Sequence, residues 1–332
     1  MRRPLLSLML LSVGVGGFAA LVGAQAPAAH LNPMIDLLLQ KKPVFGLYAP
    51  SNRRPPAAPG TVAPAVVLPA LTPAELAEDA LGVATSDFIF DGSMEGNFDR
   101  GYAAYSEFVK GIAKAGLFTR TPTHRLHHPL VVKAPEIAPN PTLAASQISR
   151  QLDLGVSGVM FVSVESAQEV KTGLAAMRFA SKGGTRPDSV GSAPSVWGLS
   201  EAEYKSKADL WPLNPQGELI NWTIVESREG LARVREIAAV PGIGVLWPGA
   251  GTLRQVFSST DATGKRVFDE AGWEAAIQQV LAACKEFKVA CGYPASANDI
   301  EKRMAQGFSV FVMGWGEPGL RAIDLGRKAG GR

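Results

Sequence analysis

A carboxylate directly follows an apolar stretch in the second half of this chain. Residues 219–225 read Leu-Ile-Asn-Trp-Thr-Ile-Val, a composition typical of a buried strand. Glu226 comes next, Ser227 can cap a helix, and apolar residues then recur at helical spacing. A carboxylate at the carboxyl end of a buried strand is well placed to bind a metal ion or a substrate. It can equally stabilise the amino end of the following helix, so position alone leaves both interpretations of Glu226 open.

Other polar residues stand behind apolar segments in the same way. They are Asp91 and Glu95 after residues 87–90, Lys133 after 129–132, Glu165 after 158–162, the segment Gly249, Ala250, Gly251 and Thr252 after 244–247, Tyr293 after 288–292, and Trp315 with Glu317 after 309–313. We favour a functional role for Lys133 and a helix-terminal role for Glu165. Asp91 is either a site residue or a turn former, and its position does not separate the two.

These residues would form one site if the strands are parallel and their carboxyl ends lie together. Several carboxylates and a lysine in one place suit a hard divalent cation and an anionic substrate. Oxygen ligands favour Mg²⁺ or Mn²⁺ over zinc. His124, His127 and His128 precede the segment at 129–133, which puts them at the opposite end of that strand, so we expect surface residues rather than ligands.

Eight short apolar segments, each followed by a helical pattern, must position these side chains. They span 43–48, 87–90, 129–133, 158–162, 219–225, 244–247, 288–292 and 309–313. Alternating strands and helices predict an α/β protein with a parallel sheet, and eight such units predict a (β/α)8 TIM barrel. An open, doubly wound sheet is the alternative. No G-x-G-x-x-G follows a strand, and the segment at 249–251 lacks the lysine of a phosphate-binding loop.

Helix boundaries and loops complete this outline. Thr72 and Glu75 predict a capping box with Pro73 at the first helical position, and Ser296 is expected to cap a helix over 296–306. A Pro/Ala-rich loop is expected at 49–71. A second long loop, at 181–217, is expected to fold partly around 201–208.

The amino terminus has the features of a secretory signal peptide. Arg2 and Arg3 precede an apolar run over 5–22, and an Ala-Gln-Ala site at 24–26 follows. We expect cleavage after Ala26, which leaves residues 27–332 as a single barrel domain. An uncleaved anchor is the alternative, but glycines within the run and the small-residue site favour removal. The mature protein is therefore expected to be exported, to the periplasm if the source is a Gram-negative bacterium, with no stable membrane insertion.

Composition narrows the partners and the chemistry further. The formal net charge of the 332 residues is +3 and no basic tract is present, so nothing in the sequence argues for nucleic-acid binding. Two cysteines exclude a disulfide-rich scaffold and a thiolate zinc site. We expect Cys284, on a helix, and Cys291, in a strand, to be buried thiols, since a disulfide requires close and suitably directed Cβ atoms.

Several segments resemble the metal-dependent pyruvate aldolases of the HpcH/HpaI group, which is related to the citrate lyase β-subunit. Similar segments are Asp-Phe-Ile-Phe-Asp at 87–91 with Met-Glu-Gly-Asn-Phe-Asp at 94–99, Leu-Val-Val-Lys at 130–133, residues 152–160, the Gly-Thr-Arg loop within 178–187, Ile-Val-Glu-Ser at 224–227 with Ala-Val-Pro-Gly-Ile at 239–243, and residues 307–312. The resemblance implies a TIM barrel of the phosphoenolpyruvate/pyruvate type. It also implies a homo-oligomer, a trimer or hexamer.

The family's site residues transfer position by position. The metal-binding Glu matches Glu226, and the Asp that supports the general base matches Asp153. The second metal ligand is an Asp in the family, where this chain has Thr252, a weaker ligand. The substrate-binding Arg is replaced by Lys133, which keeps the charge but loses bidentate geometry. The general-base His has no counterpart, because Glu95, or Gly96 with a one-residue shift, stands in its place.

The resemblance therefore implies a carbon–carbon lyase that acts on a 2-oxo or hydroxy acid through a metal-stabilised pyruvate enolate. Glu226 and Thr252 are the expected metal ligands, with Mg²⁺ or Mn²⁺ as the cofactor, and a rearranged site that uses Glu226 with Glu95 or Asp91 is the alternative. Glu95, Asp91, Lys133 and Asp153 are the expected catalytic residues, and Lys133 with Gly249, Ala250, Gly251 and Thr252 would bind the substrate. Because three functional positions are altered, the alternative is an inactive barrel that binds a small carboxylic acid. The sequence does not identify the second substrate fragment.

Overall fold

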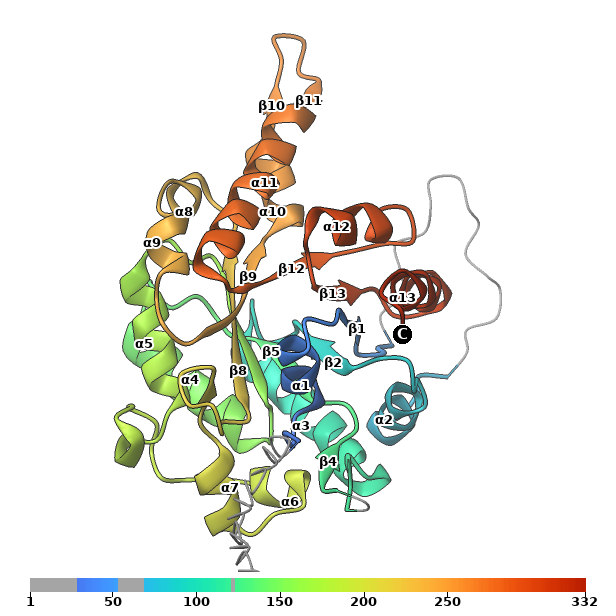
Figure 1. Ribbon diagram of the computed structural model, residues 1–332, viewed down its shortest axis with the longest axis vertical. Coiled ribbons are helices and arrows are strands. Elements are labelled where there is room, and N and C mark those ends of the chain that lie inside the picture. Colours follow the sequence, from blue (N-terminus) through green and yellow to red (C-terminus); the bar gives the residue numbers. More distant parts are fainter. Residues whose placement is uncertain (1–28, 53–68, 121–122) are drawn as a thin grey trace, which may run out of the picture.

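A closed barrel of eight parallel strands organises the molecule (Figure 1). The computed structural model describes residues 29–52, 69–120 and 123–332. The expected signal cleavage site and most of the expected loop at 49–71 lie outside these residues.

Every barrel strand coincides with a predicted segment. The strands are β1 (Val44–Tyr48), β2 (Phe88–Asp91), β5 (Leu130–Lys133), β6 (Gly158–Phe161), β8 (Leu219–Val225), β9 (Ile243–Pro248), β12 (Ala290–Pro294) and β13 (Val310–Met313). They pair in this order, and β13 pairs with β1, where Val44 lies opposite Val310. The closed ring confirms the predicted (β/α)8 TIM barrel and excludes an open sheet.

Helices pack around the outside of the strands. They are α2 (Pro73–Leu81), α3 (Phe98–Ala115), α4 (Pro141–Asp153), α5 (Ala167–Met177), α8 (Arg228–Ala232), α9 (Val234–Ala238), α11 (Glu270–Phe287), α12 (Ile300–Gln306) and α13 (Glu317–Ala329). The predicted capping box of Thr72 and Glu75 is present at α2. Ser296 does not cap α12, because the residues after it form a turn and that helix begins at Ile300.

The barrel interior is a hydrophobic core distinct from the one between strands and outer helices, and a short helix closes it at the amino ends of the strands. Inward-facing residues from β2, β8, β9 and their neighbours fill it, including Phe88 and Trp222. Helix α1 (Pro33–Leu39) inserts Met34 and Ile35 into the same core at the amino ends of the strands. The interior is therefore filled with side chains, and only the carboxyl ends of the strands leave space for a ligand.

Several elements lie outside the eight repeating units. The segment after α5 contains η1 (Ala180–Lys182), α6 (Ala193–Trp197), α7 (Glu201–Lys207) and β7 (Leu210–Trp211), so it folds around 201–208 as expected. A small hairpin pairs β3 (Phe118–Thr119) with β4 (Arg125–Leu126), and a second pairs β10 (Ser258–Thr260) with β11 (Arg266–Phe268). The second hairpin projects from the body beyond α10 (Ala250–Val256) and α11 (Figure 1).

The expectation of two buried thiols was wrong. Cys284 and Cys291 form a disulfide, with Cα atoms 5.7 Å apart. Lys288 adopts a left-handed conformation at the end of α11, which turns the chain back so that β12 begins beside the last turns of the helix. This reversal brings the two cysteines together, and sequence spacing alone did not reveal it.

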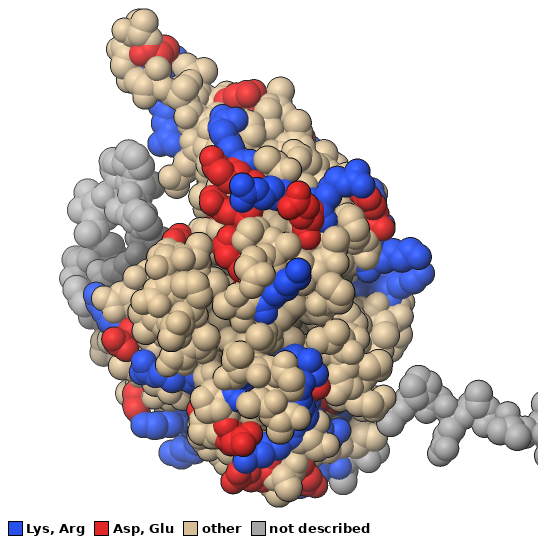
Figure 2. All heavy atoms as spheres, turned by 90° about the vertical axis from the view of Figure 1, so that its left-hand side faces the viewer, with Lys and Arg blue, Asp and Glu red and all other residues tan. Residues whose placement is uncertain are grey.

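The surface view in Figure 2 shows acidic and basic side chains interspersed over one face of the molecule. Among the described residues, no helix combines the length and apolar character needed to cross a bilayer.

Candidate active site

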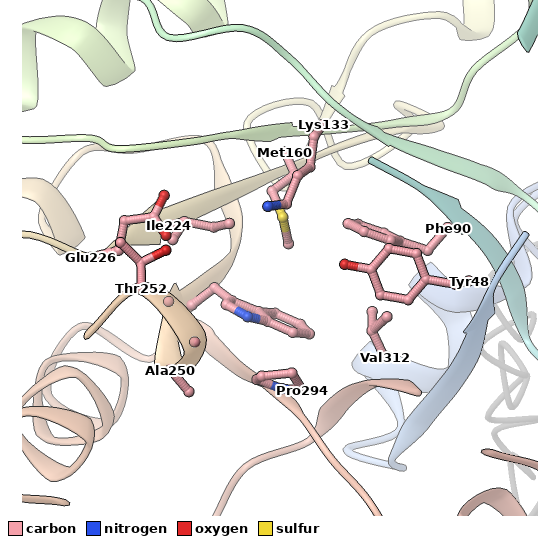
Figure 3. Close-up of a pocket in the computed structure, with 13 residues that line it drawn as sticks. Tyr48, Phe90, Lys133, Met160, Ile224, Glu226, Ala250, Thr252, Pro294 and Val312 are labelled. Atoms are coloured by element: carbon pink, nitrogen blue, oxygen red, sulfur yellow. The ribbon is translucent and has the colours of Figure 1, made fainter. Parts of the chain in front are cut away.

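A cavity of about 210 Å³ lies on the barrel axis at the carboxyl ends of the strands. All eight strands, or the residues just behind them, contribute to its wall. Glu226 and Thr252 lie on one side, Tyr48, Phe90 and Val312 on the opposite side, and the Lys133 ammonium points into the space between them (Figure 3). The structure therefore brings together Lys133, Glu226 and the segment 249–252, as the strand-end argument predicts.

Glu226 is not the cap of the helix that follows it. The Ser227 hydroxyl accepts a hydrogen bond from the Gly230 N–H and so caps α8 itself. The Glu226 side chain, which is 6% exposed, reaches across to the loop after β6. There its Oε1 accepts hydrogen bonds from the Ser163 N–H at 3.0 Å and from the Ser163 hydroxyl at 3.4 Å. The hydrogen-bonded cap of α8 is therefore Ser227, and the Glu226 side chain is directed to the loop after β6 and to the cavity.

Ser163 holds this carboxylate at a conformational cost. Its φ of 50° lies in the left-handed region, which is unfavourable for a residue with a Cβ. Ser163 could not be identified from the sequence, because nothing in a Val-Ser-Val segment signals a positive φ. Strained backbone that orients a buried carboxylate is a common feature of functional sites.

The chain after β9 approaches Glu226 closely because Gly249 has no side chain. A Cβ at position 249 would lie 2.4 Å from the Glu226 Cβ and 2.5 Å from its Oε2. The close approach brings the start of α10, with Ala250, Gly251 and Thr252, into the cavity wall. Among the described residues, no hydrogen-bond donor reaches Glu226 Oε2, which leaves that oxygen available for a ligand.

Lys133 and Glu95 form an ion pair at the edge of the cavity. The Lys133 Nζ and Glu95 Oε2 atoms are 2.7 Å apart, with side chains 17% and 37% exposed. Lys133 is further anchored through its backbone carbonyl, which accepts a hydrogen bond from Gln151. Because the Lys133 ammonium contacts Glu95 on one side and faces the cavity on the other, it can bind an anionic group of a ligand from the cavity side.

Tyr48 separates this cavity from a second one of about 370 Å³, which Asp91 and Glu95 line. The Asp91 Oδ1 accepts hydrogen bonds from the N–H and hydroxyl of Ser93. Burial, together with the Glu95 and Asp91 carboxylates, raises the pKa of Tyr48 to about 12, so its phenol is a neutral hydrogen-bond donor near neutral pH. Tyr48 ends the first strand, so the rule that identified Lys133 could also have identified it.

Asp153 does not join these residues. It ends α4, at the amino ends of the strands, where its carboxylate binds the buried Arg186 at 2.9 Å and the Ser189 hydroxyl at 3.0 Å. Its contacts fix the segment between α5 and β8. The supporting role that the resemblance implies for Asp153 has no geometric counterpart at the mouth.

Other residues behind the strands also lie outside the cavity. Glu165 contacts its own helix, since its N–H binds Glu169, and Trp315 and Glu317 are not part of the wall. Tyr293 faces the outer core and its hydroxyl accepts a hydrogen bond from Arg303. The histidines lie at the other end, as expected, but His128 is buried rather than on the surface, and burial lowers its pKa.

The donor set suits a hard cation only with help from other ligands. Glu226 offers one open carboxylate oxygen and Thr252 a neutral hydroxyl, and no group of three or more His, Cys, Asp or Glu side chains in the described part of the chain is arranged to hold a metal. Mg²⁺ commonly binds one or two carboxylates and completes its shell with water and substrate oxygens. The residues present fit such a weakly held ion.

Comparisons with known proteins agree with this architecture. The sequence pattern of the HpcH/HpaI aldolase/citrate lyase family matches residues 121–317, more than half of the chain. Among curated protein sequences, none matches the chain significantly.

Solved structures with the same fold are distant in sequence. An HpcH/HpaI aldolase/citrate lyase family protein from Burkholderia cenocepacia is 22% identical with a TM-score of 0.59, over 85% of this chain and 92% of that one. An HpcH/HpaI aldolase from Desulfitobacterium hafniense is 15% identical with a TM-score of 0.58, over 87% and 91%. Macrophomate synthase is 18% identical with a TM-score of 0.56, over 91% and 89%. At these identities the structures support the fold, whereas the family assignment rests on the sequence pattern: this chain belongs to the HpcH/HpaI aldolase/citrate lyase family.

Proposed function

We propose that this protein is a carbon–carbon lyase that cleaves or forms a hydroxylated 2-oxo acid through the enolate of pyruvate. One observation carries the proposal: Glu226, Thr252 and Lys133 line a single cavity on the axis of a barrel that belongs to an aldolase and citrate lyase family. Carboxylate, hydroxyl and ammonium groups in one cavity are the complement of a 2-oxo acid and a cation.

Glu226 and Thr252 are the residues that would hold a divalent cation, Mg²⁺ or Mn²⁺. Such an ion, when bound, supplies positive charge where the keto oxygen becomes an enolate oxygen. Lys133 would bind the carboxylate of the acid. The acid end of the substrate would therefore occupy the side of the cavity formed by Glu226 and Thr252, and the rest of the molecule would point toward Tyr48.

Glu95 is the proposed base, because it lines the adjoining cavity beside Tyr48 and its Oε2 lies 2.7 Å from the Lys133 Nζ, next to the proposed substrate. It would accept the proton from the substrate hydroxyl as the adjacent carbon–carbon bond breaks. The electron pair of that bond passes to the 2-oxo acid fragment as the enolate, and an aldehyde leaves. Return of a proton to the enolate carbon gives pyruvate. Tyr48, as a neutral phenol, can donate a hydrogen bond to the departing oxygen, and Asp91 stabilises the loop that carries Glu95 through Ser93.

The test is pyruvate release from hydroxylated 2-oxo acids by the purified mature protein with Mg²⁺, with Mn²⁺ and with a chelator. We expect turnover that depends on the added metal. Metal content should fall in Glu226→Gln but not in Glu165→Gln, the matched control, because Glu165 lies in the loop after the neighbouring strand β6 and does not line the cavity. Equal metal content in both variants would contradict the proposed site.

The altered positions support one second candidate, an inactive barrel that binds a small carboxylic acid. Thr252 replaces a carboxylate, and a carboxylate replaces the usual base. Binding of pyruvate without turnover under any metal condition would favour this candidate over the lyase.

We also propose that the mature protein is exported and forms a homo-oligomer. The Cys284–Cys291 disulfide supports export, because disulfides persist in oxidising compartments. Sequencing of the amino terminus of the exported protein tests cleavage after Ala26, and light scattering of the purified protein tests the trimer or hexamer.

A further inference from the structure

The cavity has two chemically different sides. Glu226 and Thr252 form the polar side, while Tyr48, Phe90 and Val312 face them across the space, with Pro294 nearby (Figure 3). Phe90 and Val312 are 1% and 3% exposed, so their lining surface is apolar and well shielded from solvent. A ligand whose acid end sits at Glu226 must place its other end against this apolar side.

Aromatic packing makes the apolar side rigid before any ligand binds. The Phe90 ring stacks on Trp222 at a centroid distance of 6.0 Å, and Trp222 stacks on Trp247 at 5.3 Å. Tyr48 packs edge-on against Phe90 at 4.9 Å. Because Phe90 and Trp247 both line the cavity while Trp222 supports them from below, ligand binding requires no reordering of these rings.

We propose, building on the lyase function above, that the fragment released as aldehyde is an apolar, planar group about the size of one aromatic ring. A dry apolar cavity of about 150 Å³ accommodates benzene. The present cavity of about 210 Å³ meets the second cavity of about 370 Å³ at Tyr48, so the two together have space for an acid head and a ring.

The same wall disfavours a polyhydroxylated fragment. A hydroxyl placed against Phe90 and Val312, out of reach of the Tyr48 phenol, loses its hydrogen bonds to water without gaining a partner, which weakens binding about tenfold. A ring in that position gains apolar contact and an aromatic neighbour, which strengthens binding by a similar factor. The cavity thus selects the second fragment through its apolar side rather than through a specific hydrogen bond.

Binding of two acids that cannot undergo the cleavage tests this proposal without relying on turnover. 2-Oxo-4-phenylbutanoate lacks the hydroxyl that cleavage needs, and 2-oxobutanoate is the same acid without the ring. Titration calorimetry of the full mature protein with Mg²⁺ should show the phenyl compound binding about tenfold more tightly. Equal affinities, or tighter binding of 2-oxobutanoate, would overturn the proposal even if the protein is an active lyase.

Two valines on one strand provide a matched pair of variants. Val312→Thr adds a hydroxyl to the cavity wall, whereas Val310→Thr adds one deeper in the same core, away from the cavity. The phenyl advantage should fall about fivefold in the first variant and remain in the second. Phe90→Leu should reduce it about threefold. An equal loss in Val310→Thr and Val312→Thr would show a general effect on the barrel and would refute selection by this wall.

Discussion

Strand β8 has a glutamate at each end, and the two residues have opposite uses. Glu218 precedes the strand at the closed end of the barrel, and Glu226 follows it at the open end. Both are nearly buried, at 2% and 6% exposed. Glu218 Oε1 and Oε2 accept hydrogen bonds from the backbone N–H groups of Leu31 and Asn32, and His30 Nδ1 lies 3.4 Å from Oε2. Ser163 occupies only Oε1 of Glu226.

The difference shows that burial alone does not tell whether a carboxylate keeps an oxygen available for a ligand. Glu218 has donors for both oxygens, so it serves to attach the chain that leads into α1. Glu226 keeps one oxygen directed at a cavity, at the cost of a left-handed serine and a glycine at position 249. An acceptor that remains available in strained surroundings supports the ligand site proposed above.

The largest effect is expected from Glu226→Gln. The change keeps the size of the side chain but removes the charge, so we expect kcat/KM for pyruvate-releasing cleavage to fall about a hundredfold or more. Stability should change by less than about 1 kcal/mol, because only the Ser163 contacts depend on the group. Steady-state kinetics and urea unfolding measure the two effects. If Glu226→Gln lowered the free energy of unfolding as much as Glu218→Gln, the variant described next, Glu226 would be a structural residue like Glu218.

Glu218→Gln should show the reverse behaviour. The amide nitrogen would face a backbone N–H in place of an acceptor oxygen, which should lower the free energy of unfolding by about 2 kcal/mol. Activity per folded molecule should stay within a factor of about two, since the residue lies at the far end of the strand. Urea unfolding followed by fluorescence provides the measurement, and a large loss of kcat in folded protein would contradict this assignment.

Thr252→Asp tests whether the metal binds between Glu226 and position 252 at the open end of the barrel. A second carboxylate opposite Glu226 should tighten Mn²⁺ binding about tenfold, because divalent-ion affinity rises with ligand charge. Metal titration of the variant and of Thr252→Asn, its neutral control, separates the effect of charge from that of size. Equal affinities in the two variants would place the metal elsewhere.

The smallest effect concerns His30 at the closed end. Glu218 raises the pKa of His30 above 6.5, with a further contribution from Asp36 and opposition from burial and Lys207. A raised pKa means that the protonated histidine stabilises the fold below pH 6.5 and that this contribution is lost as the pH rises through the folded-state pKa. His30→Gln should therefore lower Tm more at about pH 5.5 than at about pH 9. A difference independent of pH would exclude a charged interaction.

The sequence predicted the positions of the strands well, but not which way each side chain faces. Strand segments are short apolar runs with clear boundaries, so all eight were found, and Lys133 and Glu226 followed from their place at strand ends. Tyr293 was expected at the mouth but faces outward, because a shift of one residue along a strand reverses the side chain. Asp153 matched a family position in sequence, yet helix α4 carries it to the opposite end of the barrel.

Other features depend on contacts between distant parts of the chain. The strain at Ser163 arises from the position of Glu226, 63 residues later. The disulfide depends on how α11 ends, and the apolar side of the cavity depends on which inward residues reach the top of the barrel. The first and the last of these follow from the way distant strands meet in the barrel, whereas the disulfide follows from the left-handed conformation of Lys288 between its two cysteines.

Closure of the ring joins the two ends of the barrel sequence. Val44 of β1 pairs with Val310 of β13, 266 positions later. If this contact formed before the other strand pairs, closing the loop would cost about 5 kcal/mol of chain entropy. Until β13 is inserted, β1 and β12 each present an unpaired edge, which favours aggregation and degradation. We therefore expect the barrel to form in one cooperative step once β13 is available, and the chain to stay sensitive to proteases until that step is complete.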